Sequence, residues 1–173
     1  MFLSCFIRAF SVYNIGRFKE SEANRVQLFT ACPVRLFLFG GGFMFVFFNP
    51  NPARNLVGDC VVRGISKITN KTWDDVYLGI VMQGFYDKDM PSSNAIWDNY
   101  LRNSGYNKFI IPNTCPNCYT VNDFAEDHPT GQYLLATGTH VVAVVDGDYY
   151  DTWDSGAVTP IYYYTKQEVD DGL

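Results

Sequence analysis

The chain has 173 residues, of which 47% are hydrophobic and 17% aromatic, and its formal net charge is −5. This length suits one domain with a sizeable hydrophobic core. The acidic balance, with no cluster of Lys and Arg to meet phosphates, argues against a nucleic acid as the main partner.

The first 43 residues differ in composition from the rest of the chain. An apolar run extends from Leu36 to Phe48, across the end of this segment. It is too short and too rich in glycine to span a bilayer. It also lacks the position and the cleavage site of a signal peptide. Because a translated ribosome-binding site would resemble the three glycines and Phe43 before Met44, we expect the native chain to start at Met44. We therefore expect 1–43 to be a non-native or disordered extension and 44–173 to be one domain.

Cys60 is the first candidate for chemistry. It follows Val57-Gly58-Asp59 and opens an amphipathic run that extends to Ile68, which predicts a helix beginning at Cys60. In the first turn of a helix, free backbone N–H groups and the helix dipole favour a thiolate over a thiol. The alternative interpretation is a structural cysteine, because most cysteines before apolar helices pack as small hydrophobic residues.

Capping signals predict three further helices. They extend from about residue 73 to Gln83, from 94 to 103, and from 121 to a point before Pro129. Each begins after a Ser or Thr at the N-cap, namely Thr72, Ser93 and Thr120. Strands are predicted at 109–111, 132–137, 139–145, 148–153 and 161–166. Helices followed by an antiparallel sheet indicate the α+β class.

Cys115 and Cys118 form a CxxC in a loop between these helices and strands. Such a pair is half of a zinc site, a redox pair or a disulfide. The chain has no second CxxC, and His128 is the only nearby candidate for a third ligand, so Cys115 and Cys118 are weak metal candidates and we expect no cofactor. Five cysteines in no disulfide-like framework favour a reducing compartment.

His140 is the second candidate for chemistry, and it heads a predicted hairpin. If Asp146 and Gly147 form a two-residue turn, Asp151 lies on the same face as His140 and diagonally opposite it. Asp154 points the other way unless the turn is one residue longer. We therefore predict that Asp151 orients the imidazole, with Asp154 as the alternative third member. The alternative interpretation of His140 is an ordinary polar residue at a strand edge.

Two short segments resemble motifs of the papain-like cysteine peptidases. Gly58-Asp59-Cys60 resembles the Asp-Cys that opens the active-site helix of bacteriocin-processing peptidases and NlpC-type cell-wall amidases. Residues 138–147 resemble their second motif, with Asp151 as the third member. The similarity covers about Asn49 to Lys166. The chain also resembles small uncharacterised phage and Firmicute proteins, in the start 49–52 and the ending 150–155.

This resemblance implies a papain-like α+β fold, in which N-terminal helices with the cysteine at a helix start pack on a C-terminal antiparallel sheet. Papain-like peptidases usually carry a Gln about six residues before the cysteine, whose amide contributes to the oxyanion hole. This chain has Arg54 there, so Asn55 is the tentative oxyanion residue, with a simple turn residue as the alternative.

The combined expectation is a thiol hydrolase that acts on a peptide or protein substrate. Cys60 would attack an amide carbonyl, His140 would carry the proton, and Asp151 would orient the ring. Two alternatives stay open: a catalytically silent binding or inhibitory module of phage origin, and an amidase acting on peptidoglycan stem peptides. We expect a cytoplasmic protein of a bacterium or phage-infected host cell, with no membrane span and no prediction of oligomeric state.

Overall fold

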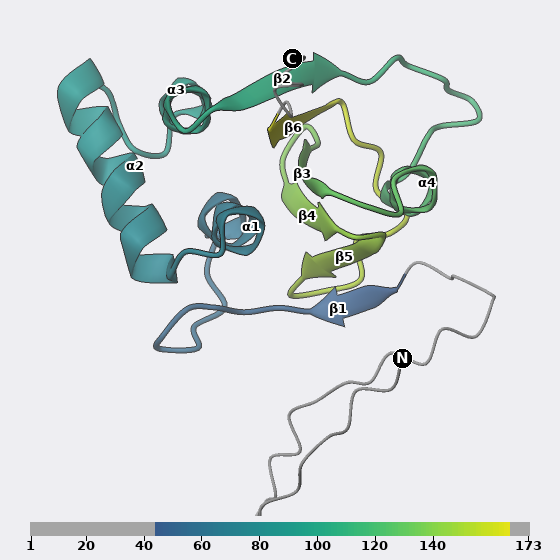
Figure 1. Ribbon diagram of the computed structural model, residues 1–173, viewed down its shortest axis with the longest axis horizontal. Helices are drawn as coiled ribbons and strands as arrows, with labels where there is room; N and C mark the ends of the chain where they lie inside the picture. Colours follow the sequence, from purple (N-terminus) through teal and green to yellow (C-terminus); the bar gives the residue numbers. More distant parts are fainter. Residues whose placement is uncertain (1–43, 167–173) are drawn as a thin grey trace, which may run out of the picture. The chain divides into compact units, whose positions relative to one another are not determined.

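The computed structural model of the chain describes residues 44–166 (Figure 1). The expectation of a non-native extension over 1–43 lies outside the described residues. Within 44–166, no helix is long and apolar enough to cross a membrane.

Ten elements follow one another along the described part of the chain. In order they are β1 (Phe45–Phe47), α1 (Cys60–Thr69), α2 (Trp73–Asp87), α3 (Asn94–Asn103), β2 (Tyr106–Ile110), α4 (Val121–Asp127), β3 (Gln132–Ala136), β4 (Val141–Val145), β5 (Asp148–Asp151) and β6 (Tyr162–Lys166). The predicted helix starts are confirmed, and α3 has the predicted bounds. Helix α2 continues four residues beyond the predicted end at Gln83.

The six strands form one mixed sheet in the order β1-β5-β4-β3-β6-β2. All neighbouring strands are antiparallel except β1 and β5, which are parallel. The α+β class is thus confirmed, but the expectation of a purely antiparallel sheet is wrong at this edge. The reason is that β1 pairs with a strand about a hundred residues away along the chain, a contact that local sequence patterns do not reveal.

The hairpin of β4 and β5 has the predicted turn. Asp146 and Gly147 have φ of 51° and 81°, as a two-residue type I′ turn requires, and Val145 pairs with Asp148. The strands are shorter than predicted, because β4 begins one residue after His140 and β5 ends at Asp151. His140 and Asp151 therefore lie together at the open end of the hairpin.

Helices cover both faces of the sheet. Alternate strand residues divide between two hydrophobic clusters: Leu134, Ala136, Val141, Ala143 and Tyr164 pack with α1, α2 and α3, whereas Leu135, Val142, Val144 and Tyr149 pack with α4. This alternation is the two-residue period of a strand buried on both sides. Figure 1 shows α1 and α4 on opposite sides of the strands.

Helix α1 lies unusually close to the sheet at Gly64. A Cβ atom at this position would stand 2.5 Å from Leu134 Cδ1 and 3.3 Å from Val141 Cγ1. Since any larger residue would push the helix away, Gly64 sets the distance between α1 and β4. This close approach brings the start of α1 to the residue that precedes β4, His140.

Candidate active site

Cys60 is the first residue of α1, and its side chain is half-buried. The first hydrogen bond of the helix runs from the Arg63 N–H to the Asp59 carbonyl at 2.9 Å. The N–H groups of Cys60, Val61 and Val62 therefore have no acceptor within the helix. Asp59 occupies the N-cap position but makes no side-chain capping bond. The positive end of the helix dipole thus lies at the thiol without a capping oxygen to offset it.

A short turn fixes the backbone of His140 before β4. The Thr137 N–H donates to the His140 carbonyl at 2.8 Å, and the His140 N–H donates to Thr137 Oγ1 at 2.9 Å. The ring of Trp153 lies 5.3 Å from the imidazole ring, and this tryptophan is 48% exposed. His140 is therefore held by its backbone on one side and covered by an aromatic ring on another.

Asp151 is the carboxylate that binds His140, as predicted. His140 Nε2 donates to Asp151 Oδ2 at 2.5 Å. Asp154, the alternative, instead accepts hydrogen bonds from the Tyr149 hydroxyl at 2.6 Å and from the Gly156 N–H at 3.1 Å. Asp154 therefore faces Tyr149 and Gly156 rather than His140.

The His140 imidazole lies next to the Cys60 thiol, close enough for each group to change the pKa of the other. Asp151 occupies Nε2 of the imidazole, so Nδ1 is the nitrogen available to the thiol. The structure therefore brings together the three residues that the sequence singled out, in the order thiol, imidazole, carboxylate. This order is the one that general-base activation of a nucleophile requires.

The electrostatics of the site favour a thiolate and an imidazolium. Burial alone raises the pKa of Cys60, but the hydrogen bond and charge of His140, a backbone hydrogen bond at Val141 and the charge of Arg63 outweigh it, so that this pKa lies below its ordinary value. The hydrogen bond to Asp151, followed by the one to Cys60, raises the pKa of His140 to about 9. Each group thus stabilises the charged form of the other.

The carboxyl group of Asp151 is ionised in this arrangement. Burial alone raises the pKa of Asp151, but hydrogen bonds from His140 and from the Thr152 N–H outweigh it and hold the pKa below its usual range. The Thr152 N–H donates to Oδ1 at 2.7 Å, which leaves Oδ2 to His140. An ionised carboxylate fixes the ring orientation and stabilises the imidazolium.

Arg63 extends the site behind Asp151. Its Nη2 donates to Asp151 Oδ1 at 3.1 Å and its Nη1 donates to Asp59 Oδ1. Asp59 Oδ2 accepts a second hydrogen bond from Trp73 Nε1 at 2.8 Å. Arg63, Asp59 and Asp151 are all less than 10% exposed. A buried cation between two buried carboxylates thus holds the orienting residue from behind.

The sequence interpretation missed Asp59 and Arg63 as part of the site. Two signals point to them: the i,i+4 spacing of opposite charges across the helix start, and a charged residue inside an otherwise apolar run. Neither signal shows that Arg63 also reaches Asp151, 88 residues away along the chain.

Asn55 is not brought to the site. It lies exposed in the loop before α1, and its backbone carbonyl accepts a hydrogen bond from Asn49 Nδ2 at 3.2 Å. Within the described residues, the structure places no contact between its side chain and Cys60 or His140. The uncapped N–H groups at the start of α1 are therefore the better candidates for an oxyanion site.

Cys115 and Cys118 are joined in a disulfide, which is one of the alternatives that the CxxC left open. The loop brings their Cα atoms to 4.2 Å, so that the sulfurs bond to each other and are not available as metal ligands. With this disulfide, the cysteines no longer favour a reducing compartment. His128 Nδ1 lies 2.9 Å from the Phe124 carbonyl and its ring stacks on Phe124. Within 44–166, no group of three or more His, Cys, Asp or Glu residues could hold a metal ion.

Comparison with known proteins adds no relative: no protein-family model, no curated protein and no solved structure matches the chain. The geometry of the Cys60, His140 and Asp151 side chains is therefore the basis for inferring a function.

Proposed function

We propose that the protein is a thiol hydrolase that cleaves a peptide or amide bond through Cys60, His140 and Asp151 on a papain-like scaffold. The observation that carries the proposal is the order of the three side chains: Asp151 is hydrogen-bonded to His140, and His140 lies beside the Cys60 thiol at an uncapped helix start. A structural cysteine and a structural histidine need no such order, and the buried Arg63 behind Asp151 serves no evident purpose for packing alone.

The reaction follows from the charges of the site. The Cys60 thiolate attacks the carbonyl carbon of the substrate, and the N–H groups at the start of α1 stabilise the negative oxygen that forms. The imidazolium of His140 gives its proton to the leaving amine as the C–N bond breaks. His140, now neutral, then takes a proton from water, which attacks the thioester and releases the acid and the thiolate.

The positions of the three side chains on helix α1 and strands β4 and β5 support a papain-like scaffold. The cysteine lies at the start of a helix, the histidine precedes a strand of the sheet, and the carboxylate ends the adjacent strand. In this arrangement, the reacting groups lie between the helical part and the sheet, as the motifs around Cys60 and His140 imply.

The proposal is tested by hydrolysis of a mixture of fluorogenic peptide amides with varied residues on both sides of the scissile bond. We expect wild-type protein to release the fluorophore and Cys60→Ala protein to release none. Purified peptidoglycan stem peptides serve as a second substrate set and distinguish the amidase. If no substrate is turned over while Cys60 proves as reactive as an ordinary thiol, the protein is a non-catalytic binding module and the proposal is wrong.

A further inference from the structure

Helix α2 has an apolar side that no described residue covers. Its buried side, Val76, Ile80 and Gly84, packs toward the core. Its other side also carries large apolar residues, which are 46–68% exposed: Tyr77, Leu78, Met82, Phe85 and Tyr86. A solvent-exposed helix normally has polar residues on this side, and a contiguous apolar patch is typical of an interaction site.

The centre of this surface has the spacing of a helix-packing seam. Asp74, Leu78, Val81, Phe85 and Lys88 follow one another at intervals of four, three, four and three residues. This is the a/d pattern that places side chains along one line of a helix for packing against a second helix. We call these five residues the α2 seam. Its three central members are apolar, and its ends carry opposite charges.

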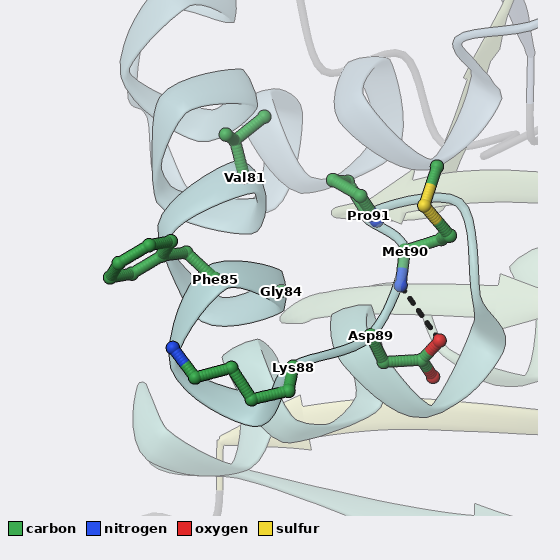
Figure 2. A pocket seen from close by; sticks show the side chains of 7 residues that line it. All are labelled: Val81, Gly84, Phe85, Lys88, Asp89, Met90 and Pro91. Atoms are coloured by element: carbon green, nitrogen blue, oxygen red, sulfur yellow. Dashed lines mark hydrogen bonds between the residues drawn. The ribbon is translucent and has the colours of Figure 1, made fainter.

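The side chains at the C-terminal end of the α2 seam lie close together. Figure 2 shows Lys88 running back beside Phe85, and its Nζ lies 4.2 Å from the centre of the Phe85 ring. An open hollow of about 490 Å³ adjoins this end, between α2 and the loop that carries Met90 and Pro91. The positive charge of Lys88 is therefore directed along the α2 seam rather than away from it.

The charges of the α2 seam are symmetric about its centre. Asp74 and Lys88 each stand seven residues from Val81, and seven residues correspond to about 10 Å along a helix. Asp74 lies in the first turn of α2, and Lys88 is the C-cap residue at its other end. Within 44–166, neither residue takes part in a salt bridge. When two copies of this helix are laid antiparallel with Val81 on Val81, Asp74 of each copy meets Lys88 of the other.

We propose that the occupant of this surface is a second copy of the chain, and that the protein forms a two-fold dimer through antiparallel α2 helices. The self-complementary charge pattern is the reason, since a two-fold interface places the same patch on both sides and pairs each residue with its counterpart. An unrelated partner has no need of opposite charges at equal distances from Val81. The apolar residues exclude water, and the two Asp74–Lys88 pairs set the antiparallel direction.

The test is the mass of the full-length chain by sedimentation equilibrium, with charge-exchange variants. We expect about twice the monomer mass of 19.7 kDa. Leu78→Glu should give a monomer. Asp74→Lys and Lys88→Asp should each raise the dimer Kd on the order of tenfold, because two attractive contacts become repulsive. The double variant restores both pairs and should return the Kd to nearly the wild-type value.

The matched control is Glu126→Lys, which makes the same charge change at an exposed position of α4 and should leave the Kd unchanged. Far-UV circular dichroism shows whether each variant is folded. All the substituted side chains are exposed on a helix or at its end. A full-length chain that stays monomeric at about 100 μM overturns the proposal, whatever covers the α2 seam. A double variant that dimerises no better than the single variants also overturns it.

Discussion

The starts of α1 and α4 differ in how their free backbone N–H groups are capped. At α4, Thr120 and Asp123 form a complete capping box, in which the Asp123 N–H donates to Thr120 Oγ1 and the Asp123 carboxylate accepts from the Thr120 N–H at 2.8 Å. At α1, Asp59 stands at the N-cap, but Arg63 and Trp73 hold its carboxylate away from the helix N–H groups. The start of α4 is therefore capped, whereas the start of α1, beside the Cys60 thiol, is uncapped.

Two i,i+4 ion pairs within residues 44–166 show the same contrast. Asp59 and Arg63 are both buried, whereas Arg102, which pairs with Asp98 at 2.7 Å on α3, is about half exposed. An exposed pair of this kind contributes little to stability. A buried charge is retained only when it is paired, and removal of its partner is costly. The pair at the start of α1 is therefore buried next to the candidate site, whereas the pair on α3 faces solvent.

The largest expected effect is on catalysis. Cys60→Ala and His140→Ala should each lower the rate of amide hydrolysis by at least about 10³-fold, and the double variant should be little worse than either single variant, because the two groups act as a unit. Initial rates with the fluorogenic amides measure this. The control is Cys115→Ser with Cys118→Ser, which should retain wild-type activity. Additive losses in the double variant would contradict a shared mechanism.

Asp151→Asn tests the third member. An amide still hydrogen-bonds the imidazole, but it stabilises the imidazolium less than a carboxylate does. We expect a residual rate above that of His140→Ala, measured on the same substrates. A rate equal to wild type would show that Asp151 has only a structural role.

The contrast between the ion pairs gives the next effect, on stability. Arg63→Met should lower the free energy of unfolding by about 3–5 kcal/mol, because Asp59 and Asp151 are left buried without a cation. Arg102→Met should lower it by less than about 1 kcal/mol. Urea unfolding at pH 7 measures both. Equal losses for the two variants would remove the distinction between the pairs.

The smallest effect concerns the closed helix start. Thr120→Ala should lower the free energy of unfolding by about 1 kcal/mol through loss of the cap. Because α4 lies across the sheet from Cys60, the alkylation rate of Cys60 should not change. A slower alkylation in this variant would show that the two helix starts are coupled.

Local signals in the sequence predicted most of the site. Ser and Thr caps located the helix starts, and the Asp146-Gly147 turn brought His140 and Asp151 to the same open end of the hairpin. These features depend on neighbours along the chain, so that a single sequence is sufficient to read them. The same holds for Cys60, whose apolar run begins where the helix begins.

The features that were missed depend on contacts between distant residues. The three-residue strand β1 is defined by its pairing with β5, not by its own pattern. In the sequence, Arg63 only interrupts an apolar helix, and its hydrogen bond to Asp151 is visible only in the structure. The Cys115–Cys118 bond requires the loop to bring the two sulfurs together, whereas the CxxC spacing also fits a metal site or a redox pair.

The central claim is the ion pair of Cys60 and His140, and the pH dependence of Cys60 alkylation tests it without a substrate. Iodoacetamide labelling of the Cys60 peptide is followed by mass spectrometry from pH 5 to 9 in wild type and in His140→Ala. Because the pKa of Cys60 is lowered mainly through His140, the wild-type thiol should stay reactive at pH 6, and His140→Ala should be slower there by at least about tenfold, following the free-thiol value near 8.5. Identical curves for the two proteins, both rising only near pH 8.5, would contradict the account.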